Sequence, residues 1–147
     1  MRILAVDYGR KKIGLALSDE LGVTAQPLLT LQRTNRRDDM RRLREICAKH
    51  LVARILVGHP LHITGEAGEM AAEAARFAAR VSKELGIETK LFDERLTSWE
   101  AKQTIAETKS SSRRKGESID AIAAAVLLRD YLEHEAHRIR NKRSEKE

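Results

Sequence analysis

The sequence is poor in aromatic residues, which make up 3% of the chain, and it contains one cysteine. So few rings leave little scope for stacking on nucleic acid bases. Cys47 has no second cysteine with which to form an intrachain disulfide, and this favours a reducing compartment. We expect Cys47 to be a small buried side chain in a helix.

Long apolar runs are also missing. No stretch approaches the roughly 20 apolar residues of a membrane span, and the first residues contain no apolar core of signal-peptide length. We therefore expect a cytoplasmic protein without membrane contact. The 147 residues fit one domain, and 28 Lys and Arg against 22 Asp and Glu give a net charge of +6. This excess of positive charge favours a polyanionic partner such as nucleic acid.

Short apolar runs bounded by turn residues predict five strands, over residues 3–7, 13–17, 28–31, 55–57 and 87–92. In this interpretation the first three runs are separated by Gly9, Gly14, Asp19, Gly22 and Pro27, and Gly58 with Pro60 ends the fourth. Helical spacing predicts one helix capped by Thr34 or Asn35 and a second over 65–85 that stops at Gly86. A third begins near Thr97 and a fourth near Ser118.

The order of these elements predicts an α/β fold. Three strands in series, followed by alternation of strands and helices, give a mixed five-stranded sheet that is antiparallel on one side, parallel on the other and flanked by helices. Residues 1–136 form the single domain in this prediction. Residues 137–147 are charged without an apolar stripe, so we expect them to be a flexible tail.

Acidic residues stand where strand ends and helix starts would bring them together. Asp7 ends the first predicted strand, Asp93 and Glu94 end the fifth, and Asp120 lies in the first turn of the last helix. Carboxylates gathered in this way suit Mg²⁺ or Mn²⁺, and two such ions would suit phosphodiester hydrolysis. Each acid also has a structural alternative: turn hydrogen bonds for Asp7, the helix dipole for Asp120, and an ion pair with Arg95 for the strand-end acids.

Four blocks of the sequence resemble the YqgF family, also called RuvX or pre-16S rRNA nuclease. They are Asp7-Tyr8-Gly9 through Ile13-Gly14-Leu15-Ala16-Leu17-Ser18-Asp19, Val57-Gly58-His59-Pro60-Leu61 with Gly65, Asp93-Glu94-Arg95-Leu96-Thr97-Ser98, and Ile119-Asp120-Ala121-Ile122-Ala123-Ala124. The resemblance runs from Met1 to about Leu132. It implies an RNase-H-like fold similar to that of the RuvC resolvases.

The resemblance also implies a function and a site. The expected activity is metal-dependent cleavage of structured nucleic acid, either at the 5′ end of precursor 16S rRNA in a ribosomal small-subunit precursor or at DNA Holliday junctions. Matched by position, the catalytic and metal-binding acids are Asp7, Glu94 and Asp120, with Mg²⁺ or Mn²⁺ as the cofactor and Asp93 as an auxiliary acid. Lys12 stands where the family pattern leads us to expect arginine, so it would attract phosphate without a bidentate clamp.

Basic residues near these acids are the candidate phosphate contacts, because guanidinium and ammonium groups supply sequence-independent affinity for nucleic acid. Solvated charge is the commoner explanation for any single lysine in such a loop. His59 and His62 lack a partnering ligand and are expected to be polar loop residues. The predicted contacts are Lys12, Arg95, Lys109, Arg113, Arg114 and Lys115.

Two other functions remain open at this point. Asp7 with Gly9 and Gly14 also resembles the first phosphate loop of actin-like ATPases, but those proteins need two such lobes and this chain has one. The other is a non-catalytic RNA-binding protein of ribosome assembly, which would use the basic surface alone. No apolar stripe demands a partner subunit, so we expect a monomer or a weak homodimer.

Overall fold

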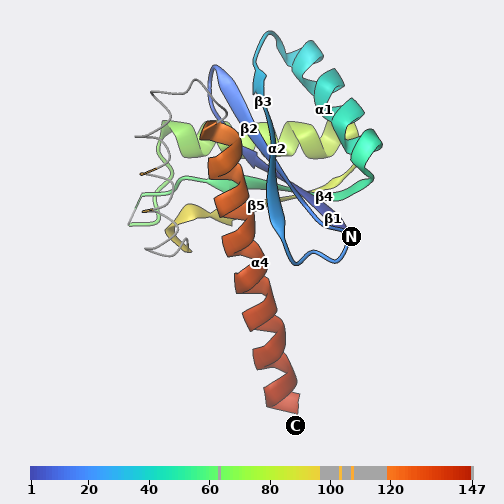
Figure 1. Cartoon of the computed structure of the whole chain (residues 1–147). Coiled ribbons are helices and arrows are strands. Elements are labelled where there is room, and N and C mark those ends of the chain that lie inside the picture. The colour runs from blue at the N-terminus through green and yellow to red at the C-terminus, as the bar shows by residue number, and fades with distance from the viewer. Residues whose placement is uncertain (63, 97–102, 104–106, 108–118, 147) are drawn as a thin grey trace.

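The computed structural model describes residues 1–62, 64–96, 103, 107 and 119–146 (Figure 1). Its strands are β1 (Arg2–Asp7), β2 (Lys12–Ser18), β3 (Ala25–Gln32), β4 (Val52–His59) and β5 (Glu88–Asp93). Its helices are α1 (Arg36–His50), α2 (Glu69–Leu85), the 3₁₀ turn η1 (Glu94–Leu96) and α4 (Ile119–Lys146). The helix predicted from Thr97, the Ser118 cap and the basic loop from Lys109 to Lys115 lie outside the described residues.

The strands form one mixed sheet in the order β3-β2-β1-β4-β5. β1 pairs antiparallel with β2, and β2 pairs antiparallel with β3. On its other edge β1 pairs parallel with β4, which pairs parallel with β5. This topology confirms the α/β prediction, and it puts β1, the strand that ends at Asp7, in the centre of the sheet.

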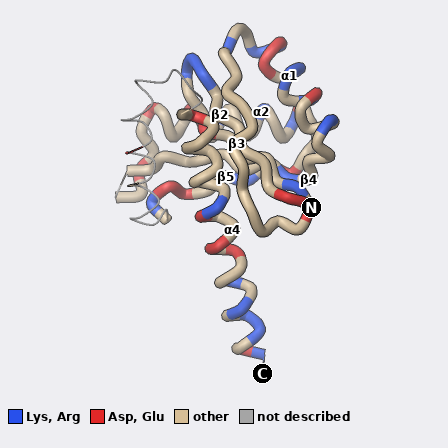
Figure 2. Tube along the Cα trace, viewed as in Figure 1, with Lys and Arg blue, Asp and Glu red and all other residues tan. Residues whose placement is uncertain are grey.

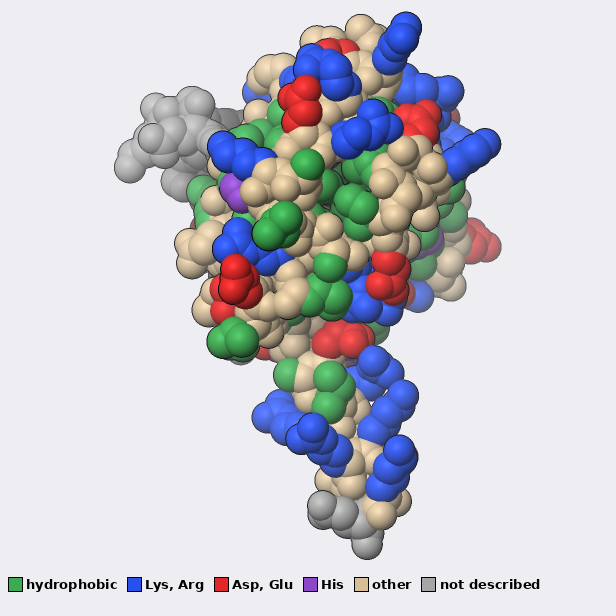
Figure 3. All heavy atoms as spheres, turned by 90° about the vertical axis from the view of Figure 1, so that its right-hand side faces the viewer, with side chains coloured by type: hydrophobic (Ala, Val, Ile, Leu, Met, Phe, Trp, Pro, Cys, Tyr) green, Lys and Arg blue, Asp and Glu red, His purple; other side chains and the backbone are tan. Residues whose placement is uncertain are grey.

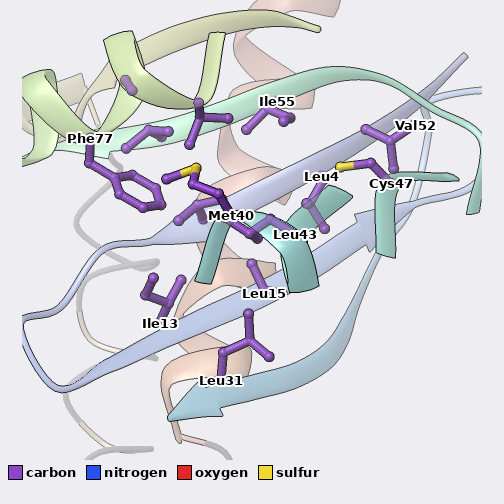
Figure 4. Packing of buried hydrophobic residues seen from close by; sticks show 14 of the residues in the cluster. Leu4, Ile13, Leu15, Leu31, Met40, Leu43, Cys47, Val52, Ile55 and Phe77 are labelled. Atoms are coloured by element: carbon purple, nitrogen blue, oxygen red, sulfur yellow. The ribbon is translucent and has the colours of Figure 1, made fainter. Parts of the chain in front are cut away.

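The two faces of the sheet are covered by different helices. Leu4 and Val6 of β1 belong to the core that includes Leu43 of α1 and Phe77 of α2, part of which Figure 4 shows. The alternate residues of the same strand, such as Ala5, pack in a second cluster with residues of α4. Because side chains alternate along a strand, Asp7 continues the row of Ala5 and faces the α4 side.

Helix α1 follows its predicted pattern closely. The side chain of Asn35 accepts a hydrogen bond from the Asp38 N–H at 2.9 Å, so Asn35 is the N-cap. Met40, Leu43 and Cys47 are buried on one face. Burial raises the pKa of the Cys47 thiol to about 11, as expected of a core cysteine.

Helix α2 begins later than the sequence pattern indicates. It starts at Glu69 instead of near residue 65, because the preceding residues close a turn of their own. In this turn the Gly65 N–H donates to the His62 carbonyl, and the His62 N–H donates to the Glu66 carbonyl. The predicted stop at Gly86 is confirmed, with φ at 66° in the left-handed region.

The end of the chain also differs from the prediction. Residues 137–146 continue α4 as an exposed helix that extends beyond the body of the protein, where we expected a flexible tail (Figure 1). The segment contains no glycine or proline, and its arginines and lysines are good helix formers, so no apolar stripe is needed for the helix to continue. None of the helices in the described part of the chain could cross a membrane.

Candidate active site

Asp7 has a glycine on each side of it in the sheet. Gly14 of β2 is its direct antiparallel partner. On the other side Val6 pairs with Val57 of β4, so Gly58 follows next to Asp7. Gly14 lies within β2, inside the strand predicted over 13–17. Gly58 lies within β4, so the prediction that it ends that strand was wrong. Glycine inside a strand often marks a close approach by another part of the chain, and here it marks two.

The first close approach is that of Asp120 to Gly14. A Cβ atom built on Gly14 would lie 1.9 Å from the Asp120 carbonyl oxygen and 2.7 Å from the Asp120 Cβ. The first turn of α4 therefore rests directly on β2 at this position. Only glycine leaves room for this contact, which brings Asp120 beside the partner residue of Asp7.

The second close approach is that of Glu94 to Gly58. A Cβ atom on Gly58 would lie 2.5 Å from Glu94 Oε1 and 3.1 Å from a methyl carbon of Leu127. The end of the Glu94 side chain thus occupies the space that a side chain on Gly58 would fill. The Glu94 carboxylate therefore lies at Gly58, the residue that flanks Asp7 on the β4 side, and on the face of the sheet that α4 covers.

The three predicted acids thus lie around one end of β1. Neighbouring strands are separated by about 4.8 Å, so Gly14 and Gly58 bring Asp120 and Glu94 to the two sides of Asp7. Oxygen-only ligands of this kind fit a hard divalent cation. The structure does not form a complete cage: among the residues it describes, no three histidine, cysteine or acidic side chains already form a group that could hold a metal ion.

Asp93 has a different environment from Glu94. It pairs with His59 at the end of β5, and by strand alternation it points to the face opposite Phe92 and α4. Its carboxylate accepts hydrogen bonds from the Arg95 guanidinium, the shortest at 2.7 Å, and one from the Arg95 N–H at 2.9 Å. The guanidinium also lies 3.2 Å from a Cβ position on Gly65. The ion pair between Asp93 and Arg95 that the sequence offered as an alternative is therefore present, and its guanidinium lies beside the loop before α2.

The Arg95 side chain lowers the pKa of Asp93 through its hydrogen bonds, and the Asp93 carboxylate raises the pKa of Arg95. Such a carboxylate favours the folded state at pH values above its unfolded-state pKa, and the contribution is lost as the pH falls through the lowered value. We expect Arg95→Gln to raise the pKa of Asp93 in a carboxyl NMR titration. Arg138→Gln, which removes the partner of Glu135, is the matched control and should leave Asp93 unchanged. An Asp93 pKa equal in both variants would contradict this assignment.

The predicted phosphate contacts are only partly within the described residues. Lys12 is exposed at the start of β2, two residues before Gly14, so its side chain emerges on the α4 face. Arg95 is exposed while paired with Asp93. The predicted contacts outside the described residues are Lys109, Arg113, Arg114 and Lys115.

Arginines hold the loop that follows Asp7, and sequence reasoning missed this role. Arg33 donates to the Gly9 carbonyl and to the Tyr8 hydroxyl, both at 3.1 Å, and pairs with buried Asp39. Arg10 in the same loop pairs with Glu73 of α2 at 3.0 Å. The contacts of Arg33 with Tyr8 and Gly9, and that of Arg10 with Glu73, join segments more than 20 residues apart, so no local pattern could have indicated them. Together they fix the loop on the side away from α4.

The fold and the arrangement of acids define a class of protein. The structure is similar to *Thermus thermophilus* RuvC in complex with a Holliday junction substrate, with a TM-score of 0.57, 15% identity, and coverage of 92% of this chain and 96% of that one. It is also similar to the fowlpox virus Holliday junction resolvase, with a TM-score of 0.52, 13% identity, and coverage of 91% and 99%. At such identities the likeness establishes the fold alone, which is the RNase-H-like fold of RuvC.

Sequence comparison gives the family. The profile described as "RuvX: Holliday junction resolvase" matches residues 1–134. A relative from *Koribacter versatilis*, named "Putative pre-16S rRNA nuclease", is 41% identical over 132 residues, which cover 90% of this chain and 86% of the relative. A relative of the same name from *Carboxydothermus hydrogenoformans* is 38% identical, with coverage of 92% and 99%. The chain therefore belongs to the RuvX family, which confirms the resemblance found in its motifs.

Proposed function

We propose that this protein is a metal-dependent nuclease that hydrolyses phosphodiester bonds in structured nucleic acid, and that its substrate is the 5′ end of precursor 16S rRNA. The observation that carries the proposal is the pair of glycines beside Asp7, which bring Asp120 and Glu94 to the same end of β1. The named activity of the relatives supports the choice of substrate.

In this proposal Asp7, Glu94 and Asp120 hold two Mg²⁺ or Mn²⁺ ions. When bound, such ions activate a water molecule and stabilise the oxygen that leaves the phosphorus. The protein supplies the carboxylates and their positions: β1 carries Asp7 outward, and the contacts at Gly14 and Gly58 set the approach of the other two acids. No protein nucleophile is required. Lys12 and Arg95 attract the phosphates that flank the cleaved bond.

The test is a parallel cleavage assay. Purified protein is incubated with a precursor 16S rRNA fragment that spans the mature 5′ end and, separately, with a four-way DNA junction, each with Mg²⁺, Mn²⁺ or EDTA. The proposal expects cleavage of the RNA that depends on the metal ion and stops in EDTA. Cleavage of the RNA that persists unchanged in EDTA would exclude the metal-dependent site.

Junction resolution is the second candidate function, supported by the family description and the RuvC-like fold. Symmetric cleavage of a junction needs two active sites, and so a dimer, whereas trimming an RNA end needs one. The mass of the protein in solution and the cleavage assay together distinguish the two functions, because junction resolution needs a dimer. A protein that binds both probes and cuts neither would instead be a non-catalytic RNA-binding protein of ribosome assembly.

A further inference from the structure

The last turns of α4 form a basic helix that the proposed active site does not use. We call this segment, residues 137–146, the basic extension. It carries five lysines and arginines against one glutamate, and all of its residues are exposed. Figure 2 shows this concentration of positive charge along the part of α4 that projects from the domain. Figure 3 shows basic side chains on both sides of the projection.

The basic extension lies beyond the part of the chain that the RuvX family model matches. The match to the RuvX profile ends at residue 134, just before the extension begins. Burial also ends here, because Tyr131 is the last buried residue of α4. A helix that continues past both limits without covering any core is not needed to complete the domain. The positive charge of the extension therefore serves either to keep the helix in solvent or to bind a partner.

The chemistry of the extension selects one kind of partner. Ile139 is its only large apolar side chain, so it lacks the apolar face with which a helix enters a membrane surface or binds a groove in a protein. Two copies of the extension would repel each other. Dense positive charge with little apolar area is suited to a phosphate backbone.

The positions of the arginines connect the extension to the rest of the helix. Arg140 and Arg143 are three residues apart and share one side. Arg129 is exposed and lies eleven residues before Arg140, which is about three full helical turns, so it lies on the same side. Glu133 interrupts this row with a negative charge. Arg129 therefore places one further cation on this side of α4, between the extension and Asp120.

We propose that the basic extension is a second nucleic-acid contact, which holds the phosphate backbone of the substrate far from the cleaved bond. This inference rests on the proposed nucleic-acid substrate. At 1.5 Å per residue, Arg140 lies roughly 30 Å along the helix from Asp120. A-form RNA rises about 3 Å per base pair, so roughly ten or more base pairs would span that length. Only substrates longer than this can reach both sites.

The test compares two variants that lose the same charge. Arg140→Gln, Lys142→Gln and Arg143→Gln together remove three of the five positive charges of the extension. The control, Arg36→Gln, Arg37→Gln and Lys49→Gln, removes three exposed cations from α1 on the opposite face of the sheet. Binding of a labelled long RNA stem-loop and of a stem shorter than about eight base pairs is measured in full-length protein over a range of salt concentrations.

We expect the extension variant to bind the long stem-loop about tenfold more weakly, with a salt slope smaller by about 2, and to bind the short stem like wild type. The α1 control should bind both probes like wild type. Equal losses in both variants, equal losses on both probes, or no binding by wild type would overturn the inference. Circular dichroism checks that the helix remains. If the extension variant loses affinity for the long RNA but the wild-type protein cuts no substrate, the second contact is supported and only the nuclease proposal is rejected.

Discussion

Replacing Asp7 by asparagine should abolish cleavage while leaving the protein folded. Asparagine keeps the size of the side chain and removes the charge that a divalent cation requires. Electrostatic stabilisation by a metal ion contributes several kcal/mol to such reactions, so we expect a loss of at least about 100-fold in cleavage rate. Single-turnover cleavage of the RNA fragment measures this effect. Glu94→Gln and Asp120→Asn should cause losses of the same order.

Asp19 offers a matched control for Asp7, because it also follows a strand. Its carboxylate accepts hydrogen bonds from the N–H groups of Val23 and Thr24, at 2.7 Å and 3.1 Å, and these hydrogen bonds lower its pKa. Asp19 thus has the turn-forming role that was the structural alternative for Asp7. Asp19→Asn should weaken this turn and leave cleavage intact. If Asp7→Asn cuts as well as Asp19→Asn, the proposed site is wrong.

Stability provides an independent measure of the same site. Carboxylates that converge without a metal ion repel one another, so the metal-free Asp7→Asn protein should be as stable as wild type or more stable. Added Mg²⁺ should raise the melting temperature of wild type and have little effect on the variant, because a ligand stabilises only a state that binds it. A clear drop in melting temperature of Asp7→Asn in EDTA would mean that Asp7 has a structural role.

The sheet could be predicted because its signals are local. Runs such as Ile3 to Val6 and Ile55 to Val57 are buried strands in the structure, and the change from three consecutive strands to strand-helix alternation indicated the mixed topology. The acids at the strand ends could be singled out for the same reason. A charged residue at the end of an apolar run is visible without knowledge of any distant contact.

The features that sequence reasoning missed depend on distant contacts or on weak local preferences. Gly58 was predicted to end a strand because glycine is common in turns, and only the positions of Asp120 and Glu94 explain why glycine stands at 14 and 58 within strands. The end of α4 lacks an apolar face, so periodicity could not predict the helix there. Its residues are nevertheless good helix formers, and the chain continues the helix started by buried residues such as Leu128.

Gly14→Ala should produce the largest loss of stability among single substitutions at the site. The new methyl group would overlap the Asp120 carbonyl oxygen, which belongs to the backbone of α4 and cannot rotate away. Ordinary overpacking costs about 1–3 kcal/mol, and a clash with backbone should reach or exceed the upper end of that range. Urea unfolding measures the change. The control Ala53→Gly exchanges the same two residue types at an exposed position of β4, where the register against β1 shifts, and should cost no more than about 1 kcal/mol.

Gly58→Ala tests whether the glycine positions the Glu94 side chain, whereas Gly14→Ala tests whether glycine leaves room for the backbone of α4. The methyl group of Gly58→Ala would meet the end of the Glu94 side chain, which can rotate, and a methyl of Leu127. The loss of stability should therefore be smaller than in Gly14→Ala, whereas cleavage should fall because the Glu94 carboxylate is displaced from Asp7. Equal stability of Gly14→Ala and wild type would mean that α4 does not rest on β2 at this position. Normal cleavage by Gly58→Ala would mean that Glu94 can be moved without affecting the reaction, which would remove it from the proposed metal-binding acids.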